Sequence, residues 1–367
     1  MNGLKMLPFT IFLSILFIGC GPGQPTLYPA NHKNINVMGR TERRPEGDIV
    51  LITPASGVSC RLSGENCVVY LKNEVPEGQH SLVVFEVDGK YMGRYKVEGD
   101  TVNHFPLKLP DEKKFHNLKI FKATEAQNGK LVFIGISCLS LKTPDSLPAR
   151  SIEFIGNSIT CGMGADFDEI PCGTGEWYDQ HNAYLSYGAI IARKLDARFM
   201  LSAVSGIGIY RTWNTEGPSM PAVYENRFLN EDSSLRWDFS TFRPDIVSIC
   251  LGTNDLSDGD KVTPRQPFDE EIFINRHISF INTIRNHYPK AIIAMLSSPV
   301  VTGEKKSILD NCLKKIRDHF EPTEPGMVTL FLFDRSLGAG CTGHPDKKEQ
   351  EQTAALLLPF FANLFQN

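Results

Sequence analysis

Four short polar segments, far apart in the sequence, carry the residue types that ester hydrolysis requires. They are Gly156-Asn157-Ser158, Ser205-Gly206, Gly252-Thr253-Asn254-Asp255 and His344-Pro345. Such chemistry needs a hydroxyl nucleophile, a base within hydrogen-bond reach and neutral donors aimed at the developing oxyanion. We expect Ser158 to attack an acyl carbonyl while His344 accepts its proton and returns it to the leaving alcohol. The N–H groups of Ser158 and Gly206 and the side-chain amide of Asn254 are expected to form the oxyanion hole.

Each of these segments follows, or lies in the loop after, a stretch with strand character. Beyond residue 150, apolar runs alternate with segments of helical periodicity, which indicates a parallel, doubly wound sheet. The runs are 151–155, 198–204, 245–251, 291–297 and 327–333. Ligands of open parallel sheets bind beyond the carboxyl ends of the strands, so a single site is predicted to hold all four segments.

The helices between these runs are predicted from apolar residues that share one face. One such face is formed by Ile274, Ile278, Ile281 and Ile284. A last helix is expected over 349–365, and Pro359 inside it predicts a kink or a break into two pieces. His181 and His277 are expected to be solvated, because no partner for them is visible in the sequence.

The region before residue 145 has a different pattern. Short β-rich runs are separated by turn dipeptides such as Asp88-Gly89 and Asn128-Gly129, which is typical of a hairpin-rich β-sandwich. The runs are 48–53, 67–71, 81–87, 91–97, 118–123 and 131–141. Two prolines in 143–148 then mark a boundary. We therefore expect a sandwich domain over 34–145 and a catalytic domain over 150–367, in agreement with a length that favours two domains.

The N-terminus predicts export. Lys5 precedes the apolar run 6–19, which is too short to span a bilayer and has the length of a signal-peptide core. The run ends in Phe17-Ile18-Gly19-Cys20, which resembles the bacterial lipobox whose cysteine becomes lipidated. We expect removal of 1–19, a lipid on Cys20, a tether over 20–33 and a location in the bacterial cell envelope, with membrane attachment through the lipid alone. A buried N-terminal helix that ends by chance at a cysteine is the alternative.

Composition narrows the classes of partner. The chain is 41% hydrophobic and 22% charged with a net charge of -4, so it lacks the basic excess with which proteins bind phosphate backbones. Nucleic acid is therefore not an expected partner, and nothing in the sequence specifies an oligomeric state. Cys161 and Cys172 bracket a loop beside Ser158; pairing in an export compartment and two buried free thiols both remain open.

The four segments, in this order, resemble those of the SGNH (GDSL) hydrolase superfamily, over roughly 150–367. Asn157 stands where the family name implies Asp, and Thr160 stands where an ordinary nucleophile elbow would require Gly. A narrower resemblance rests on the front sandwich, the Gly-Asn-Ser-Ile-Thr-Cys-Gly segment 156–162 and the Ser-Gly-Ile-Gly segment 205–208: the chain is similar to carbohydrate esterase family 2. That resemblance implies an SGNH-type five-stranded sheet, a jelly-roll front domain and removal of acetyl groups from plant polysaccharides such as xylan and glucomannan. It also implies a mechanism without metal or cofactor.

One position departs from the superfamily pattern. Many SGNH enzymes place an Asp two or three residues before the histidine, where this chain has Thr342 and Cys341. We therefore expect a Ser158/His344 dyad whose imidazole is oriented by a backbone carbonyl, and we expect Asp346 to cap the final helix. A triad remains the alternative.

Other interpretations of the same residues are weaker. Ser158 alone would be read as a helix N-cap. Cys341-x-x-His344 has the spacing of two zinc ligands, but a closed zinc site needs further Cys or His residues suitably placed. Gly206-x-Gly208 lacks the third glycine of a dinucleotide fingerprint, since Arg211 occupies that place.

The substrate is the least constrained part of the prediction. Trp177 and Trp213 follow the first two strands of the sheet and are expected to overhang the pocket, where aromatic faces could stack on sugar rings. The same chemistry on another acyl group would give a lipase, a thioesterase or a sialic-acid acetylesterase. A glycan-binding lipoprotein without activity is the non-enzymatic alternative.

Overall fold

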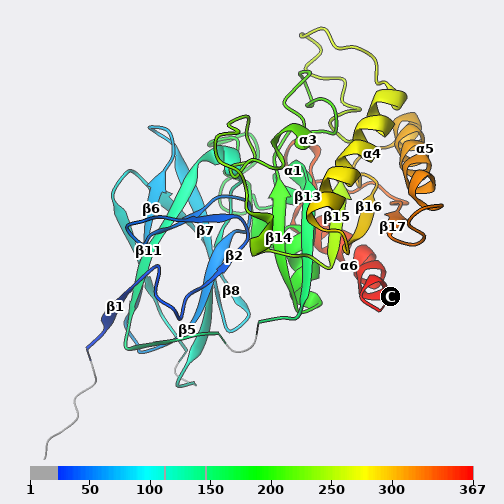
Figure 1. Cartoon of the computed structure of the whole chain (residues 1–367). Coiled ribbons are helices and arrows are strands. Elements are labelled where there is room, and N and C mark those ends of the chain that lie inside the picture. The colour runs from blue at the N-terminus through cyan, green and yellow to red at the C-terminus, as the bar shows by residue number, and fades with distance from the viewer. Residues whose placement is uncertain (1–23, 111–112, 145–146, 367) are drawn as a thin grey trace, which may run out of the picture.

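The computed structural model describes residues 24–110, 113–144 and 147–366. The predicted signal peptide and the predicted lipidation site Cys20 lie outside the described residues. Among the residues it does describe, no helix combines the length and the apolar character needed to cross a membrane. The chain forms two packed units, a β-sandwich and an α/β unit, which lie side by side in Figure 1.

The front unit consists of two antiparallel sheets that face each other. One sheet has the order β3-β4-β11-β6-β9 with β1 paired to β11, and the other has the order β12-β5-β10-β7-β8 with β2 paired to β5. The elements are β1 Thr26–Pro29, β2 Asn36–Met38, β3 Thr41–Arg43, β4 Ile49–Leu51, β5 Gly57–Ser63, β6 Cys67–Glu74, β7 His80–Val87, β8 Lys90–Glu98, β9 Val102–Leu107, β10 His116–Lys122, the short helix η1 Ala126–Asn128, β11 Lys130–Cys138 and β12 Ser140–Lys142. Strand β6 alternates buried and half-buried residues along its length, as a strand does when one face meets a core.

The structure corrects the predicted tether over 20–33. Thr26–Pro29 forms strand β1, which pairs antiparallel with β11 from Thr26 opposite Cys138 to Pro29 opposite Gly135. The side chains of β1 are mostly exposed, so backbone pairing rather than burial holds this strand. A strand without a buried face has no hydrophobic alternation, and for this reason the strand could not be predicted from the residue pattern.

The second unit is built on a parallel sheet of order β14-β13-β15-β16-β17. Its elements are β13 Arg150–Gly156, α1 Ser158–Cys161, η2 Ala183–Leu185, α2 Tyr187–Lys194, β14 Ala197–Ala203, α3 Met220–Val223, η3 Phe239–Thr241, β15 Ile246–Cys250, α4 Glu270–His287, β16 Ile292–Leu296, α5 Gly303–Phe320, β17 Val328–Phe331, η4 Cys341–Gly343 and α6 Lys347–Leu364. The α6 helix continues through Pro359 as one element, so the predicted break into two pieces is wrong.

Helices cover both faces of this sheet. Ile155 of β13 packs in a cluster with residues of α4 and α5, whereas its neighbour Phe154 packs in a second cluster with residues of α2 and α6. Successive side chains of a strand point to opposite faces, so this division places one helix pair on each side. The predicted fold class, a β-sandwich followed by a doubly wound five-stranded parallel sheet, is confirmed.

The sandwich packs against the β14 edge of the parallel sheet (Figure 1). Phe121 and Val84 of the sandwich belong to the same buried cluster as α2 and α6. Arg40 of the sandwich is fully buried, lies 3.7 Å from the equally buried Glu153 of β13, and donates to the carbonyl of Tyr224. The two units therefore share both apolar core and buried polar contacts.

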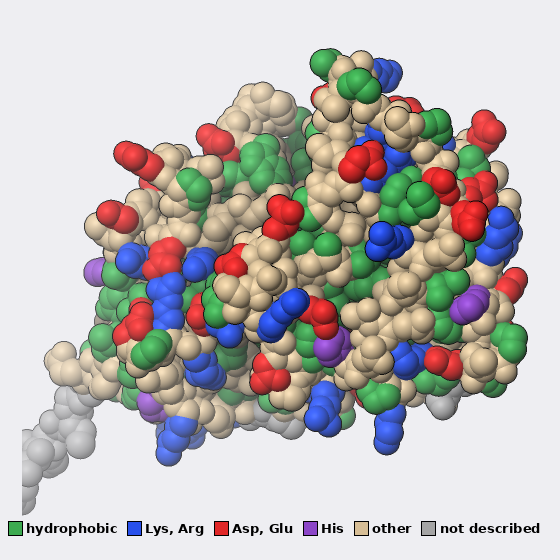
Figure 2. Space-filling model, turned by 45° about the horizontal axis from the view of Figure 1, so that its top comes forward, with side chains coloured by type: hydrophobic (Ala, Val, Ile, Leu, Met, Phe, Trp, Pro, Cys, Tyr) green, Lys and Arg blue, Asp and Glu red, His purple; other side chains and the backbone are tan. Residues whose placement is uncertain are grey.

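On the surface, Figure 2 shows acidic and basic side chains interspersed over the visible face.

Candidate active site

Ser158 lies at the carboxyl end of β13, as the first residue of the short helix α1. The N-cap of this helix is Asn157, whose side chain accepts a hydrogen bond from Ile159 N at 3.1 Å, so Ser158 is not the cap. The turn is tight: a Cβ on Gly156 would lie 2.0 Å from Thr160 Oγ1. Only glycine fits there, and the turn leaves the hydroxyl of Ser158 free to face the carboxyl edge of the sheet.

His344 directly contacts the nucleophile. Its Nε2 lies 2.7 Å from Ser158 Oγ although 186 residues separate the two in sequence. On the other side of the ring, Nδ1 lies 3.2 Å from the Cys341 carbonyl oxygen and 3.0 Å from Thr342 Oγ1. A proton on Nδ1 satisfies these acceptors and leaves Nε2 to accept from the serine hydroxyl.

The imidazole of His344 is oriented without a carboxylate. In the described part of the chain the contacts of Nδ1 are a carbonyl and a hydroxyl, and Asp346 instead caps α6, where its side chain accepts from Glu349 N at 2.8 Å. Burial lowers the pKa of His344 below its usual value, and the hydrogen bonds to Cys341 and Thr342 partly oppose that fall. The ring is therefore neutral at pH 7 and able to act as a base.

A disulfide fixes the residue that orients this ring. Cys172 pairs with Cys341, across 169 residues and with a Cα–Cα distance of 5.3 Å. Cys161 remains a buried free thiol whose Sγ donates to Glu125 Oε2 at 2.8 Å. Pairing of Cys161 with Cys172 is thus wrong, because Cys161 ends helix α1 and its side chain faces the sandwich. The alternative of two buried free thiols holds for Cys161 but is wrong for Cys172.

The loop after β14 contributes Gly206, whose φ of +78° favours glycine. Its carbonyl accepts from Trp213 N at 2.8 Å, and the preceding amide, Ser205 N, donates to Glu125 Oε2 at 2.7 Å. The amides of Ser158 and Gly206 donate to no acceptor within the described ranges. Both N–H groups are consequently available to a ligand.

The loop after β15 supplies Asn254 and Asp255. Asn254 Nδ2 donates to the Ile207 carbonyl at 2.8 Å, which uses one of the two amide hydrogens. Asp255, which is fully buried, accepts from the backbone amides of Ile209 and Tyr210 at 2.9 Å. These bonds join the loop after β14, just beyond the second polar segment, to the third polar segment, a structural role for Asp255 that no sequence pattern indicated.

A cavity of about 390 Å³ lies beside Ser158 and His344. Its apolar lining residues are Ile159, Leu256, Val300 and Val301, and its polar ones, besides the pair itself, include Thr253, Asn254, Ser257, Asp258, Thr302 and Lys305. The cavity thus combines a small apolar wall with groups that can hydrogen-bond to hydroxyls.

The two tryptophans do not line this cavity. Each is 46% exposed. Trp213 packs on Gly206, where an added Cβ would lie 2.8 Å from Trp213 Cδ1. The Trp177 ring stands edge-on to His181, 5.1 Å between centroids. His181 is fully buried and so is His277, so the expectation that both are solvated is wrong.

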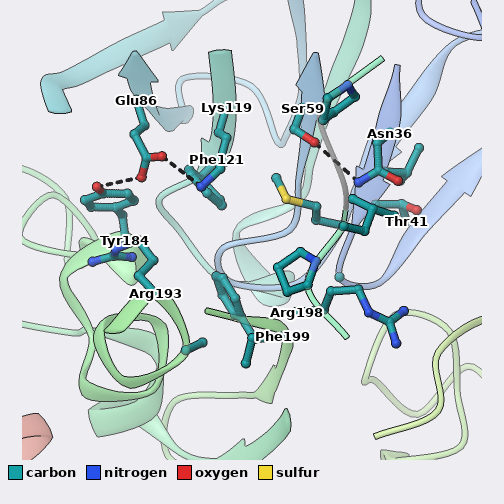
Figure 3. A pocket seen from close by; sticks show the side chains of 18 of the residues that line it. Asn36, Thr41, Ser59, Glu86, Lys119, Phe121, Tyr184, Arg193, Arg198 and Phe199 are labelled. Atoms are coloured by element: carbon teal, nitrogen blue, oxygen red, sulfur yellow. Dashed lines mark hydrogen bonds and ion pairs between the residues drawn. The ribbon is translucent and has the colours of Figure 1, made fainter. Parts of the chain in front are cut away.

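A second, larger cavity of about 1320 Å³ lies between the sandwich and the α2–β14 region (Figure 3). Among the side chains that line it, Glu86 accepts from Tyr184 Oη at 2.9 Å and lies 2.9 Å from Lys119 Nζ, and Arg193 stacks on the Tyr184 ring. Ser158 and His344 do not line this cavity and belong instead to the smaller one.

The zinc alternative does not fit this site. Within the described residues, no group of three or more His, Cys, Asp or Glu side chains could hold a metal ion. The sulfur of Cys341 is bonded to Cys172 and is not a thiolate, which removes one of the two ligands that the Cys341-x-x-His344 spacing offered.

Comparisons with known proteins agree with this architecture. The GDSL-like Lipase/Acylhydrolase family matches residues 154–322, and the Carbohydrate esterase 2 N-terminal family matches residues 37–148. The chain is 24% identical over 336 residues to an acetylxylan esterase / glucomannan deacetylase of Cellvibrio japonicus, which covers 90% of this chain and 88% of that protein. It is 36% identical over 241 residues to the cellulase/esterase CelE of Acetivibrio thermocellus, which covers 63% of this chain and 28% of CelE.

Solved structures show the same arrangement of both units. A family two carbohydrate esterase from Clostridium thermocellum, in complex with cellohexaose, has a TM-score of 0.80 and 26% identity, covering 90% of this chain and 99% of that one. A family two carbohydrate esterase from Cellvibrio japonicus has a TM-score of 0.79 at 22% identity, covering 93% and 98%, which shows the shared fold. The chain thus consists of a Carbohydrate esterase 2 N-terminal domain followed by a GDSL-like lipase/acylhydrolase domain, the two-domain arrangement of the family two carbohydrate esterases to which it is similar.

Proposed function

We propose that this protein is a serine esterase that removes acetyl groups from plant cell-wall polysaccharides, xylan or glucomannan, or from their oligosaccharides. The observation that carries the proposal is the 2.7 Å contact between Ser158 Oγ and His344 Nε2, beside the backbone amides of Ser158 and Gly206, which donate to none of the described residues. The names of the relatives, acetylxylan esterase / glucomannan deacetylase, support the substrate class.

In the proposed acylation step, Ser158 Oγ attacks the acetyl carbonyl carbon while His344 Nε2 takes the hydroxyl proton. The oxyanion of the tetrahedral intermediate accepts from Ser158 N, Gly206 N and the free amide hydrogen of Asn254. Collapse breaks the bond to the sugar oxygen, which receives the proton from Nε2, and leaves an acetyl group on Ser158. Water then repeats the sequence and releases acetate.

The imidazolium formed in each step is stabilised by neutral acceptors. The Cys341 carbonyl oxygen and Thr342 Oγ1 both face Nδ1, and Thr342 Oγ1 itself donates to that carbonyl at 2.7 Å. These groups keep the proton on Nδ1 and the lone pair on Nε2, as a carboxylate does in a triad. We therefore propose a Ser158/His344 dyad.

The cavity lining supports a short acyl group on a polar alcohol. The side chains of Ile159, Leu256 and Val300 offer apolar surface to a methyl group. Ser257 and the exposed Asp258–Lys305 pair, whose charged atoms lie 2.6 Å apart, offer donors and acceptors to sugar hydroxyls. The half-exposed ring of Trp213, packed on Gly206, provides an aromatic face for a sugar ring.

We further propose that the mature chain begins at a lipidated Cys20 and is exported to the bacterial cell envelope. The support is the apolar run 6–19 with its terminal Gly19-Cys20. In this proposal 34–145 is the sandwich domain and 150–367 the catalytic domain, with strand β1 holding the segment after Cys20 to the sandwich.

The test is acetate release from acetylated glucomannan and acetylated xylan by the wild type and by Ser158→Ala. Ser186→Ala is the matched control, because the Ser186 hydroxyl is also buried but only donates to the Ala183 carbonyl. We expect release by the wild type and the control and none by Ser158→Ala. Release from short nitrophenyl esters but from neither glycan would move the substrate elsewhere, a preference for long acyl chains would indicate a lipase, and glycan binding without any turnover would refute the esterase.

A further inference from the structure

A carboxylate from the sandwich reaches the loop that carries Gly206. Glu125 follows strand β10 as the N-cap of η1, and its side chain is fully buried. Its Oε2 accepts from Ser205 N at 2.7 Å, while its Oε1 accepts from Gln127 Nε2. The amide of Ser205 immediately precedes the amide that we assign to the oxyanion hole.

The same oxygen also contacts the helix that begins with the nucleophile. Glu125 Oε2 accepts from Cys161 Sγ at 2.8 Å, and Cys161 is the last residue of α1, whose first residue is Ser158. A single carboxylate thus binds the loop of Gly206 and the helix of Ser158. This one side chain therefore fixes the distance between the helix that follows β13 and the loop that follows β14.

The backbone around Glu125 is itself anchored. The buried Lys122 ammonium donates to the carbonyls of Ile52 and Glu125 at 2.8 Å and to that of Gly129 at 2.5 Å. Burial lowers the pKa of Lys122 to about 7, and the Glu125 charge opposes that fall. Burial likewise raises the pKa of Glu125, whereas the hydrogen bonds from Cys161, Gln127 and Ser205 favour its charged form.

The loop is held on both sides of the donor amide. Before it, Ser205 N is bound by Glu125; after it, the Gly206 carbonyl is bound by Trp213 N at 2.8 Å. The peptide between these two bonds carries the Gly206 N–H, which donates to no other residue of the described chain. Fixing both neighbours fixes the direction of this N–H.

We propose that Glu125 is a positioning residue for the oxyanion hole, through which the sandwich takes part in catalysis. The inference rests on the proposed esterase function. Packing alone does not explain a carboxylate here, because replacing a whole buried ion pair by apolar side chains of similar volume is often neutral or stabilising, whereas removing only one partner is costly. A misplacement of about 1 Å in a catalytic group can cost about 10²-fold in rate, so an acceptor at this place has a kinetic consequence.

Three variants separate positioning from packing. Glu125→Met keeps the volume but removes the acceptor; Glu125→Asp keeps the charge but ends one methylene short of Ser205 N; Glu125→Gln keeps an acceptor oxygen at full length. The matched control is Glu86→Gln, since Glu86 is another buried sandwich carboxylate at the same interface but binds Tyr184 Oη instead of the loop.

The readouts are kcat and KM on a small acetyl ester, the inhibition constant of a boronic acid that forms a tetrahedral adduct with a serine hydroxyl, and the melting temperature. We expect kcat to fall about 10²–10³-fold in Glu125→Met, the range for loss of an oxyanion donor, with KM within about threefold. The kcat of Glu125→Asp should fall by at least about tenfold, and that of Glu125→Gln should stay within about tenfold of the wild-type value. The kcat of Glu86→Gln should be unchanged. Boronate affinity should fall in parallel with kcat.

Outcomes distinguish this inference from the proposed function. An active wild type with folded Glu125→Met and Glu125→Asp variants of unchanged kcat would overturn the positioning role and leave the esterase standing. Equal losses of kcat in Glu125→Gln and Glu86→Gln, in proportion to the fall in melting temperature, would also overturn the positioning role, because they would show a packing effect. A wild type inactive on every ester would overturn both proposals together.

Discussion

Replacing Asn254 by alanine should separate catalysis from stability at one side chain. The Asn254 amide is predicted to donate one hydrogen to the oxyanion, and it donates the other to the Ile207 carbonyl at 2.8 Å. Removal of one oxyanion donor typically costs about 2.7–4 kcal/mol of transition-state stabilisation, which is about 10²–10³ in kcat. KM should change little, because the oxyanion exists only after attack.

The same substitution also leaves the Ile207 carbonyl without its partner. An unsatisfied buried acceptor costs about 1–3 kcal/mol of folding free energy. Asn254→Ala should therefore unfold at a lower temperature as well. Asn226→Ala serves as the control, because its side-chain amide is also buried and donates to a backbone carbonyl, that of Asn230 at 2.7 Å.

The assay compares kcat and KM for 4-nitrophenyl acetate with the thermal melting curve of each variant. Asn226→Ala should lose stability and keep kcat, whereas Asn254→Ala should lose both. A folded Asn254→Ala variant with kcat within threefold of wild type would refute the assignment of Asn254 to the oxyanion hole.

Three further outcomes are expected. Burial lowers the pKa of His344, and a histidine can act as a base only when it is unprotonated. The value of kcat/KM should therefore rise with pH through an inflection below pH 6.5 and then level off. An inflection above pH 6.5 would contradict the assignment of His344 as the base. Cys172→Ser should lower the free energy of unfolding, as measured by urea unfolding, by about 2–4 kcal/mol. It should also lower kcat, because the disulfide holds Cys341, whose carbonyl orients the His344 ring. An unchanged kcat would show that the disulfide is not needed for that orientation. Trp213→Ala should raise KM for an acetylated oligosaccharide more than for 4-nitrophenyl acetate, and equal changes on both would argue against sugar stacking.

The candidate site could be located from the sequence because the four polar segments are local signals. Each follows a strand or lies in the loop beyond it, and parallel strands bring their carboxyl ends to one edge. This reasoning placed Ser158 and His344 together although 186 residues separate them. It also predicted the carbonyl that faces Nδ1, because Thr342 and Cys341 offered no carboxylate.

Burial on helix α4 shows where periodicity misleads. The predicted apolar face used Ile274, Ile278, Ile281 and Ile284, but Ile274 and Ile278 are only partly buried, while Phe273 and His277 are fully buried. The helix is turned so that the Phe273 and His277 side chains, four residues apart, lie on the inner face. Residue polarity alone could not predict this, because a neutral histidine beside an aromatic ring is tolerated in a core.

The contacts between the two units could not be predicted from the sequence. Glu125 and Ser205 lie 80 residues apart in different units, and their contact depends on how the sandwich packs against β14. The pairing of Cys172 with Cys341 likewise depends on the approach of two loops, and connectivity among several cysteines cannot be deduced from spacing. Neither residue pair involves a recognisable motif.

The two long-range contacts bear on different parts of the proposed reaction: the Cys172–Cys341 disulfide on the histidine base, and the Glu125–Ser205 contact on the oxyanion hole. The Cys341 carbonyl accepts from His344 Nδ1, His344 N and Thr342 Oγ1, yet it carries no formal charge, so it stabilises an imidazolium less than a carboxylate would. In the proposed mechanism, more of the barrier is then lowered on the oxyanion side, where the groups on either side of the Gly206 amide are bound: Ser205 N donates to Glu125, and the Gly206 carbonyl accepts from Trp213 N. A site with a neutral partner for its histidine is for this reason expected to depend strongly on a rigid oxyanion loop, and in our proposal that rigidity comes from Glu125, a carboxylate of the front sandwich.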